Sequence, residues 1–91
     1  NGIPDYVIKP DFGDIDIVEL SQSYINIYLL NVDKKDANNY VSTIKDFFLL
    51  DETDKKDKNQ LFFGFDEDNN VVLIEYDKNS SELQISYEFC M

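Results

Sequence analysis

The chain has 91 residues, among them 19 acids, 8 lysines and no Arg or His, which gives a net charge of −11. A chain this short forms one domain, because domains span roughly 50–250 residues. Its acidity disfavours direct binding to nucleic acid or to anionic membranes, since both need Lys or Arg to meet phosphate groups. The sequence also lacks the run of about 20 apolar residues that spans a bilayer.

We therefore expect a single small acidic domain over residues 1–91, with residues 1–12 as an extended arm that holds both prolines. Because the first residue is Asn1 rather than Met, we expect a processed chain, a chain that keeps a tag residue, or a piece of a longer protein. The lone Cys90 cannot form an internal disulfide, which favours a reducing compartment and hence a cytoplasmic location.

Two strands are expected in the first third of the chain. Residues 14–17 alternate acidic and apolar side chains with the period of a strand. The alternation changes phase over residues 18–20, which predicts a bulge or a strand end there. Residues 24–32 are rich in β-forming side chains and carry apolar residues on both faces, a pattern typical of a central strand.

A helix is expected over residues 37–48, because apolar side chains recur there at the spacing of one helical face: Ala37, Tyr40, Val41, Ile44, Phe47 and Phe48. Asp33 or Asp36 can cap its first turn by accepting the free backbone N–H groups. The helix should end before Asp51 and Glu52, because the helix dipole disfavours anions at a C-terminus.

The rest of the chain predicts a loop and three strands. Residues 51–59 hold no apolar side chain and alternate acids with lysines, as solvated loops do. Strands are expected near 61–65, 71–77 and 83–89, with turns rich in Asp, Asn and Ser between them. The expected fold is α+β: a five-stranded, mostly antiparallel sheet with one amphipathic helix, in the order β-β-α-β-β-β and in two layers.

One helix can cover only one face of such a sheet, and the predicted strands carry apolar residues on both faces. One register holds Tyr28, Leu30, Phe62, Val72, Ile74 and Tyr76, and the opposite register holds Leu29, Phe63, Leu73 and their neighbours. Two alternatives remain for the second face. Either the arm or segments outside this chain cover it, or it is an interface with a partner or with a second copy in a homodimer.

The acidic surplus is confined to the ends of the chain, with net charges of −4 over residues 1–32, −1 over 33–59 and −6 over 60–91. These ends hold the predicted strands, so they can present an anionic surface that steers a basic protein partner. The candidate partner-binding residues are six acids and two tyrosines that would serve as aromatic anchors: Asp14, Asp16, Glu19, Asp66, Glu67, Asp68, Tyr28 and Tyr76. The alternative is that the charge serves solubility alone.

Catalysis and metal binding find little support in the residue types. The chain has no His to act as a base near neutral pH, and Cys90 has no His to make it a thiolate. Zinc needs several Cys or His ligands. Residues 66–70 match the start of an EF-hand loop, but Val71 stands where that loop needs Gly. We therefore expect no enzyme activity, no metal and no cofactor.

Three stretches resemble motifs of the SUKH superfamily. Residues 3–6 (Ile-Pro-Asp-Tyr) are similar to its Leu-Pro-x-x-Tyr entry motif, residues 24–28 before a helix to its strand-to-helix passage, and residues 60–70 to its Ile-Gly-x-Asp-Gly-Gly-Gly hairpin. Pro10 precludes the helix that normally follows the entry motif, and Asp-Asn-Asn replaces the glycine cluster. The resemblance covers residues 24–77 and implies an α+β bacterial immunity protein that neutralises a toxin, often a nuclease, without catalytic residues.

The leading interpretation is an acidic immunity or inhibitor protein that neutralises a basic toxin or nuclease by charge complementarity. One alternative is a structural or interaction domain cut from a larger protein. Another is a phage-type DNA mimic that blocks a defence protein. A steep salt dependence of association would favour an electrostatically steered inhibitor over an apolar domain contact.

Overall fold

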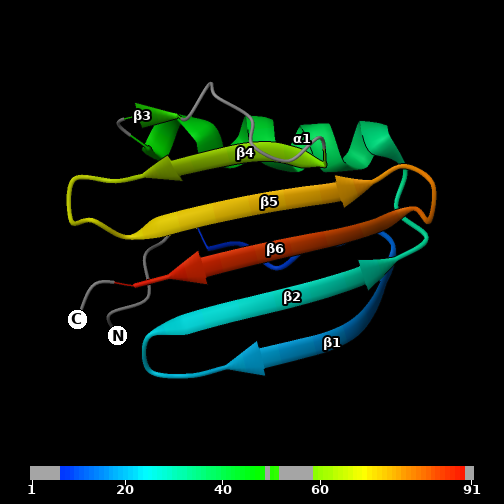
Figure 1. The fold of residues 1–91 in the computed structure, drawn as a ribbon, viewed down its shortest axis with the longest axis horizontal. Coiled ribbons are helices and arrows are strands. Elements are labelled where there is room, and N and C mark those ends of the chain that lie inside the picture. The colour runs from blue at the N-terminus through cyan, green and yellow to red at the C-terminus, as the bar shows by residue number, and fades with distance from the viewer. Residues whose placement is uncertain (1–6, 49, 52–58, 90–91) are drawn as a thin grey trace.

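The computed structural model describes residues 7–48, 50–51 and 59–89. Within these residues, six strands form one antiparallel sheet in the order β1-β2-β6-β5-β4-β3, and the helix α1 lies along the β4 side of it (Figure 1). The elements are β1 (Asp14–Leu20), β2 (Tyr24–Leu30), α1 (Lys34–Ile44), the 3₁₀ turn η1 (Lys45–Phe47), β3 (Leu50–Asp51), β4 (Gln60–Phe65), β5 (Val71–Asp77) and β6 (Glu82–Glu88). The α+β class, the single helix and the predicted element order are confirmed, and the two-residue β3 is an addition to them.

The helix α1 packs its apolar stripe onto β4 and β5. Ala37, Tyr40 and Ile44 are buried as the 3.6-residue spacing predicts. The prediction was wrong for Phe47, which is 53% exposed, because the chain tightens into η1 after Ile44 and the side chains change phase. Asp33 occupies the N-cap position without a side-chain capping bond, and its carbonyl accepts the Ala37 N–H at 3.1 Å.

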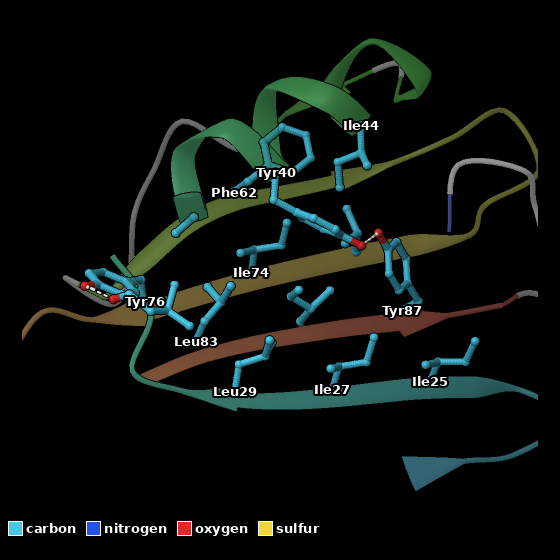
Figure 2. Packing of buried hydrophobic residues seen from close by; sticks show 14 of the residues in the cluster. Ile25, Ile27, Leu29, Tyr40, Ile44, Phe62, Ile74, Tyr76, Leu83 and Tyr87 are labelled. Atoms are coloured by element: carbon cyan, nitrogen blue, oxygen red, sulfur yellow. Dashed lines mark hydrogen bonds between the residues drawn. The ribbon is translucent and has the colours of Figure 1, made fainter. Parts of the chain in front are cut away.

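The core lies between α1 and the sheet face beneath it, where alternate residues of four strands point toward the helix (Figure 2). Since successive side chains of a strand point to opposite faces, the period of two places all of them on one side. Full burial of an aliphatic side chain stabilises a fold by about 1.5–3 kcal/mol, so this face supplies most of the stability. The buried strand residues are Ile25, Ile27, Leu29, Phe62, Val72, Ile74, Tyr76, Leu83, Ile85 and Tyr87.

The described part of the N-terminal arm packs on the same side as α1. Pro10 is buried, and the ring of Phe12 meets the ring of Tyr40 edge-on with centroids 6.2 Å apart. The Tyr40 hydroxyl donates to the carbonyl of Ile8 at 2.7 Å. Residues 1–6, which include the SUKH-like entry motif, lie outside the described residues. From Val7 onward, the arm therefore closes the helix side of the sheet and not its other face.

A tyrosine pair inside the core fastens the arm to the sheet. The single hydroxyl proton of Tyr40 goes to Ile8, so the Tyr87 hydroxyl is the donor in their mutual 2.7 Å bond (Figure 2). Burial raises the pKa of Tyr40 above its ordinary value, while the bonds to Tyr87 and Ile8 oppose that rise. A β6 residue, a helix residue and the arm are thus joined by one polar chain.

The bulge predicted in the first strand is present but lies earlier than expected. The register between β1 and β2 shifts between Ile15 and Ile17, which makes Asp16 the extra residue. From Ile17 to Leu20 the pairing with β2 is regular. Asp14 and Asp16 are therefore not a simple alternating pair on one strand face, as the sequence pattern implied.

Candidate functional site

The face of the sheet opposite α1 carries the remaining side chains of the strands, and we call it the open face. Among the described residues, no helix or loop packs across it (Figure 1). Most of its side chains are half-exposed, in contrast to the buried side chains of the helix side. By register it holds Asp14, Ile17 and Glu19 of β1; Tyr24, Asn26, Tyr28 and Leu30 of β2; Phe63 and Phe65 of β4; Val71, Leu73, Glu75 and Asp77 of β5; and Glu82, Gln84, Ser86 and Glu88 of β6.

The open face bears an acidic hollow of about 300 Å³ near the end of the sheet where β1 begins. Cross-strand pairing aligns Ile17, Tyr28, Gln84 and Glu75 in one row across its floor. The Gln84 amide donates to the Tyr28 hydroxyl at 3.5 Å and to Ser86 Oγ at 3.3 Å. Four carboxylates from three strands line the hollow: Asp16, Glu75, Asp77 and Glu82.

A second, more apolar hollow of about 370 Å³ lies toward the other end of the same face. Its lining side chains are aromatic or aliphatic except for Asn26, Ser86 and Glu88. The apolar side chains on this face are Tyr24, Phe63, Val71 and Leu73, whereas Tyr87 borders the hollow from β6 but buries its side chain on the helix side. The open face therefore joins an anionic half to an apolar half, which is the composition of a protein interface with a polar rim beside a desolvated centre.

The charges are separated by secondary structure. The five longer strands hold seven acids, three in β1, two in β5 and two in β6, and no lysine. Within the described ranges, the lysines lie in the arm, in or beside α1, and in the turn after β5: Lys9, Lys34, Lys35, Lys45 and Lys78. Among the strand residues of the open face, carboxylates therefore occur without interleaved lysines, so their fields add at the surface.

The structure divides the eight predicted partner-binding residues into three groups. Asp14, Glu19 and Tyr28 lie on the open face, and Asp16 lines its acidic hollow. Asn31 donates to the Asp14 carboxylate at 2.8 Å and Asn26 donates to Glu19 at 3.2 Å, which holds both acids in place. These residues form the β1–β2 side of the site.

The acids of the β4–β5 turn do not join this group. Glu67 and Asp68 are exposed, but their turn lies at the opposite end of the sheet from Asp14, level with Tyr24 and Glu88. Two other strands, β2 and β6, separate β5 from β1. The first strand and the turn therefore form separate anionic regions and not a single patch.

Asp66 and Tyr76 have structural roles. Asp66 is buried, and its carboxylate accepts the N–H groups of Asp68 and Asn70 at 2.9 Å and the Asn70 amide at 3.0 Å. These bonds shape the turn, which is a tight hairpin connection. Tyr76 is 7% exposed on the helix side, and its hydroxyl donates to the Val32 carbonyl at 2.7 Å. Both side chains are buried, so we exclude Asp66 and Tyr76 from the candidate site.

Three acids of the hollow were missed in the sequence, namely Glu75, Asp77 and Glu82. Glu75 and Asp77 lie two residues apart on the open face of β5, but the sequence pattern registered both only in the overall charge. The signal that could have identified these acids was the absence of lysine from every predicted strand. Their proximity to Asp16 follows from β6 lying between β2 and β5, which the sequence pattern does not reveal.

The site suits binding by charge and shape. Within the described part of the chain, no group of three or more His, Cys, Asp or Glu side chains is arranged to hold a metal ion. The same residues include no helix long and apolar enough to cross a membrane.

No protein-family model matches this chain, and no curated protein or solved structure matches it. The SUKH resemblance therefore remains a prediction.

Proposed function

We propose that this chain is a protein-binding module that holds a basic partner against its open face, in the form of an immunity or inhibitor protein for a basic toxin or nuclease. The observation that carries the proposal is the segregation of charge: seven acids and no lysine in the five longer strands. A basic partner would be steered to that face and not to the helix side.

In this mechanism the carboxylates stand where substrate phosphates would lie. Asp16, Glu75, Asp77 and Glu82 would meet the Lys and Arg side chains with which a nuclease holds its substrate. Tyr28 would pack beside them, and the apolar hollow around Phe63 would exclude water from the contact. Occlusion of the partner's basic surface then inhibits it, so the chain needs no cofactor or catalytic group. We place this activity in the bacterial cytoplasm.

The test compares two variants with the same change in net charge. Glu75→Gln, Asp77→Asn and Glu82→Gln together neutralise three of the four carboxylates of the hollow, while Asp46→Asn, Glu67→Gln and Asp68→Asn neutralise three acids outside it. Each set removes three negative charges from a net charge of −11. Tagged chains are used to capture proteins from the source organism's lysate at low and at high salt, and bound proteins are identified by mass.

The expected result is one basic protein retained at low salt by the wild type and by the second variant, and lost with the hollow variant. Its toxin or nuclease activity should fall when the wild-type chain is added. Loss with the second variant alone would move the site to the acids of η1 or of the β4–β5 turn. Capture of the same protein by all three chains at all salt concentrations would overturn the electrostatic mechanism.

The apolar hollow favours a second candidate, an interaction domain of a larger protein. In that case a neighbouring domain would cover Phe63, Leu73 and Val71, and the contact would be insensitive to salt. A DNA-mimic inhibitor of a defence protein would share the acidic face with the leading proposal. Only the identity of the captured protein separates the two.

A further inference from the structure

The strand β1 forms one edge of the sheet and is exposed along all seven of its residues. An edge strand presents backbone N–H and C=O groups that can pair with another extended segment. Its aliphatic side chains are unusually accessible, with Leu20 at 72%, Ile17 at 49% and Val18 at 47% exposed. In the described part of the chain, nothing pairs with the outer side of β1.

The hydrogen bonds at the β1–β2 turn identify which backbone groups point outward. The Ser21 N–H donates to the Tyr24 carbonyl, so Ser21 and Tyr24 form a hydrogen-bonded pair. Such pairs alternate with non-bonded ones along an antiparallel ladder. Glu19 and Ile17 therefore bond to β2, and the N–H and C=O groups of Val18 and Leu20 point away from the sheet.

An independent bond on the other side of β2 supports this assignment. The Phe89 N–H donates to the Ser23 carbonyl at 2.7 Å, which makes the odd-numbered residues of β2 the bonding partners of β6. Its even-numbered residues, Asn26 and Tyr28, are then left to bond with Glu19 and Ile17. The free edge consequently offers two complete pairs of donors and acceptors, at Val18 and Leu20.

The side chains around this edge specify what kind of strand would fit. Val18 and Leu20 lie on the helix side and expose aliphatic surface, whereas Glu19 lies on the open face, where it pairs with Asn26 of β2. A second copy of this chain fits poorly, because it would bring Asp14, Asp16 and Glu19 of two chains together, each chain with a net charge of −11. A basic segment is attracted by the same acids.

We propose that β1 extends its sheet by pairing with an extended segment of a basic protein partner, in which Lys or Arg alternates with aliphatic residues. The partner's backbone bonds to Val18 and Leu20, its aliphatic side chains pack beside theirs, and its cations lie on the open face near Glu19 and Asp16. This inference rests on the proposed function, for which it supplies the mode of partner binding. Main-chain bonds then give affinity and the alternating side chains give specificity.

The probe is a capped octapeptide of alternating Lys and Val, added to the full ¹⁵N-labelled chain. Amide hydrogen exchange and chemical shifts are followed by NMR for residues of β1. In the free chain, the amides of Val18 and Leu20 should exchange fast and those of Ile17 and Glu19 slowly, as the bonding pattern requires. With the peptide, the Val18 and Leu20 amides should shift downfield and their exchange should slow.

Two matched controls isolate the backbone contribution. The same peptide with N-methyl groups on alternate residues keeps its charge but cannot pair, and it should leave both amides unprotected. The variant Val18→Pro removes one outward N–H while leaving the bonds to β2 in place, and Val18→Thr keeps that N–H. Peptide binding should weaken with the first substitution and persist with the second.

The outcomes separate this inference from the proposed function. Shifts confined to Tyr28, Glu75 and Gln84, with Val18 and Leu20 unchanged, would overturn strand addition while leaving the acidic face as the binding site. Binding of neither peptide at low salt would count against both. Protection of Val18 and Leu20 that grows with chain concentration in the absence of peptide would identify a second copy as the occupant and overturn the assignment to a basic partner.

Discussion

The two faces of this sheet are built from alternate residues of the same strands, yet they differ in almost every property. On β2, β4, β5 and β6 the helix side is closed by α1 and by the arm, and its side chains are mostly apolar and buried. The open face holds half-exposed aromatic residues together with Glu75, Asp77, Glu82 and Glu88. No lysine occurs on either face of the five longer strands. The strand register places the carboxylates of β5 and β6 on the open face.

This contrast indicates that alternate residues of each strand serve different purposes, one set the stability of the fold and the other set the binding of a partner. Substitutions at one set of positions should act on stability, and substitutions one residue away should act on association. A helix-facing residue loses buried contacts when it is truncated, whereas an open-face residue loses little in the isolated chain because water already reaches it. The following experiments measure how complete this separation is, beginning with the largest expected effect.

Truncation of the core should cost the most. Ile85 is fully buried on the helix side, and Leu73 is half-exposed on the open face in the adjacent strand. Ile85→Ala should lower the free energy of unfolding by roughly 2–5 kcal/mol, from the lost burial and the cavity left behind. Leu73→Ala should cost well under half as much. Urea denaturation of both variants makes the comparison, and equal losses would show that the open face is also part of the core.

A substitution at the connection between the arm and β1 should cause the next largest loss of stability. Gly13 has φ of +64°, and a Cβ atom there would lie 2.7 Å from Val32 Cγ2 and 3.0 Å from the Leu30 carbonyl oxygen. Gly13→Ala should therefore destabilise the fold by about 1–3 kcal/mol in thermal or urea unfolding. Asn69→Gly, at another residue with positive φ, relieves strain and should not destabilise. A neutral Gly13→Ala variant would mean that the arm can move away from the helix side at little cost.

Removal of the buried hydroxyl should give a loss of stability that is comparable or smaller, with a distinctive pH dependence. Tyr40→Phe removes the hydrogen bonds to the Ile8 carbonyl and to the Tyr87 hydroxyl, at a cost of about 1–3 kcal/mol near neutral pH. Burial raises the pKa of Tyr40 in the folded chain, so its ionisation opposes folding. The stability tied to its neutral form is complete below the unfolded pKa of about 10 and is lost as pH rises through the folded pKa.

Alkaline unfolding curves test this sign. Above pH of about 10, the wild type should lose stability more steeply than Tyr40→Phe, which has no hydroxyl to ionise at that position. Tyr24→Phe removes an exposed tyrosine of β2 and should follow the wild-type curve. Parallel curves for the wild type and Tyr40→Phe would contradict the burial of this hydroxyl.

Neutralisation of the acidic hollow should have the smallest effect on folding. The combined change of Glu75→Gln, Asp77→Asn and Glu82→Gln relieves repulsion between like charges, so stability at low salt should stay within about 0.5 kcal/mol of wild type or rise. Added salt should stabilise the wild type more than this variant, because screening has less repulsion left to reduce. A large loss of stability would assign these acids to the fold and weaken the case that they serve binding.

Much of the local structure was accessible from periodicity. The stripe of Ala37, Tyr40 and Ile44 predicted α1, and the alternation in residues 83–89 predicted the buried side of β6. Phe47 was assigned wrongly because a change from α to 3₁₀ geometry alters the spacing without changing the residue pattern. The bulge was placed too late for a similar reason, since Asp16 is as regular in sequence as its neighbours.

Strands with apolar side chains on both faces could not be oriented from the sequence. Tyr28 and Leu30 had been grouped with Tyr76, but pairing through β6 places them on the open face and Tyr76 in the core. When both registers of a strand are apolar, hydrophobicity cannot say which one the helix covers. The packing of α1 onto β4 and β5, together with the arm, decides it.

By itself, the sequence determined the class of fold, the single helix, the order of elements and the confinement of acid surplus to the strand-bearing ends. These are local properties, because each depends on the spacing of side chains along one segment or on a count of charges. The tertiary structure alone decided that β6 lies between β2 and β5, which brings Asp16 near Glu82 and Glu75. Strand order depends on contacts between residues far apart in the chain, and no local pattern records which strands those contacts will join.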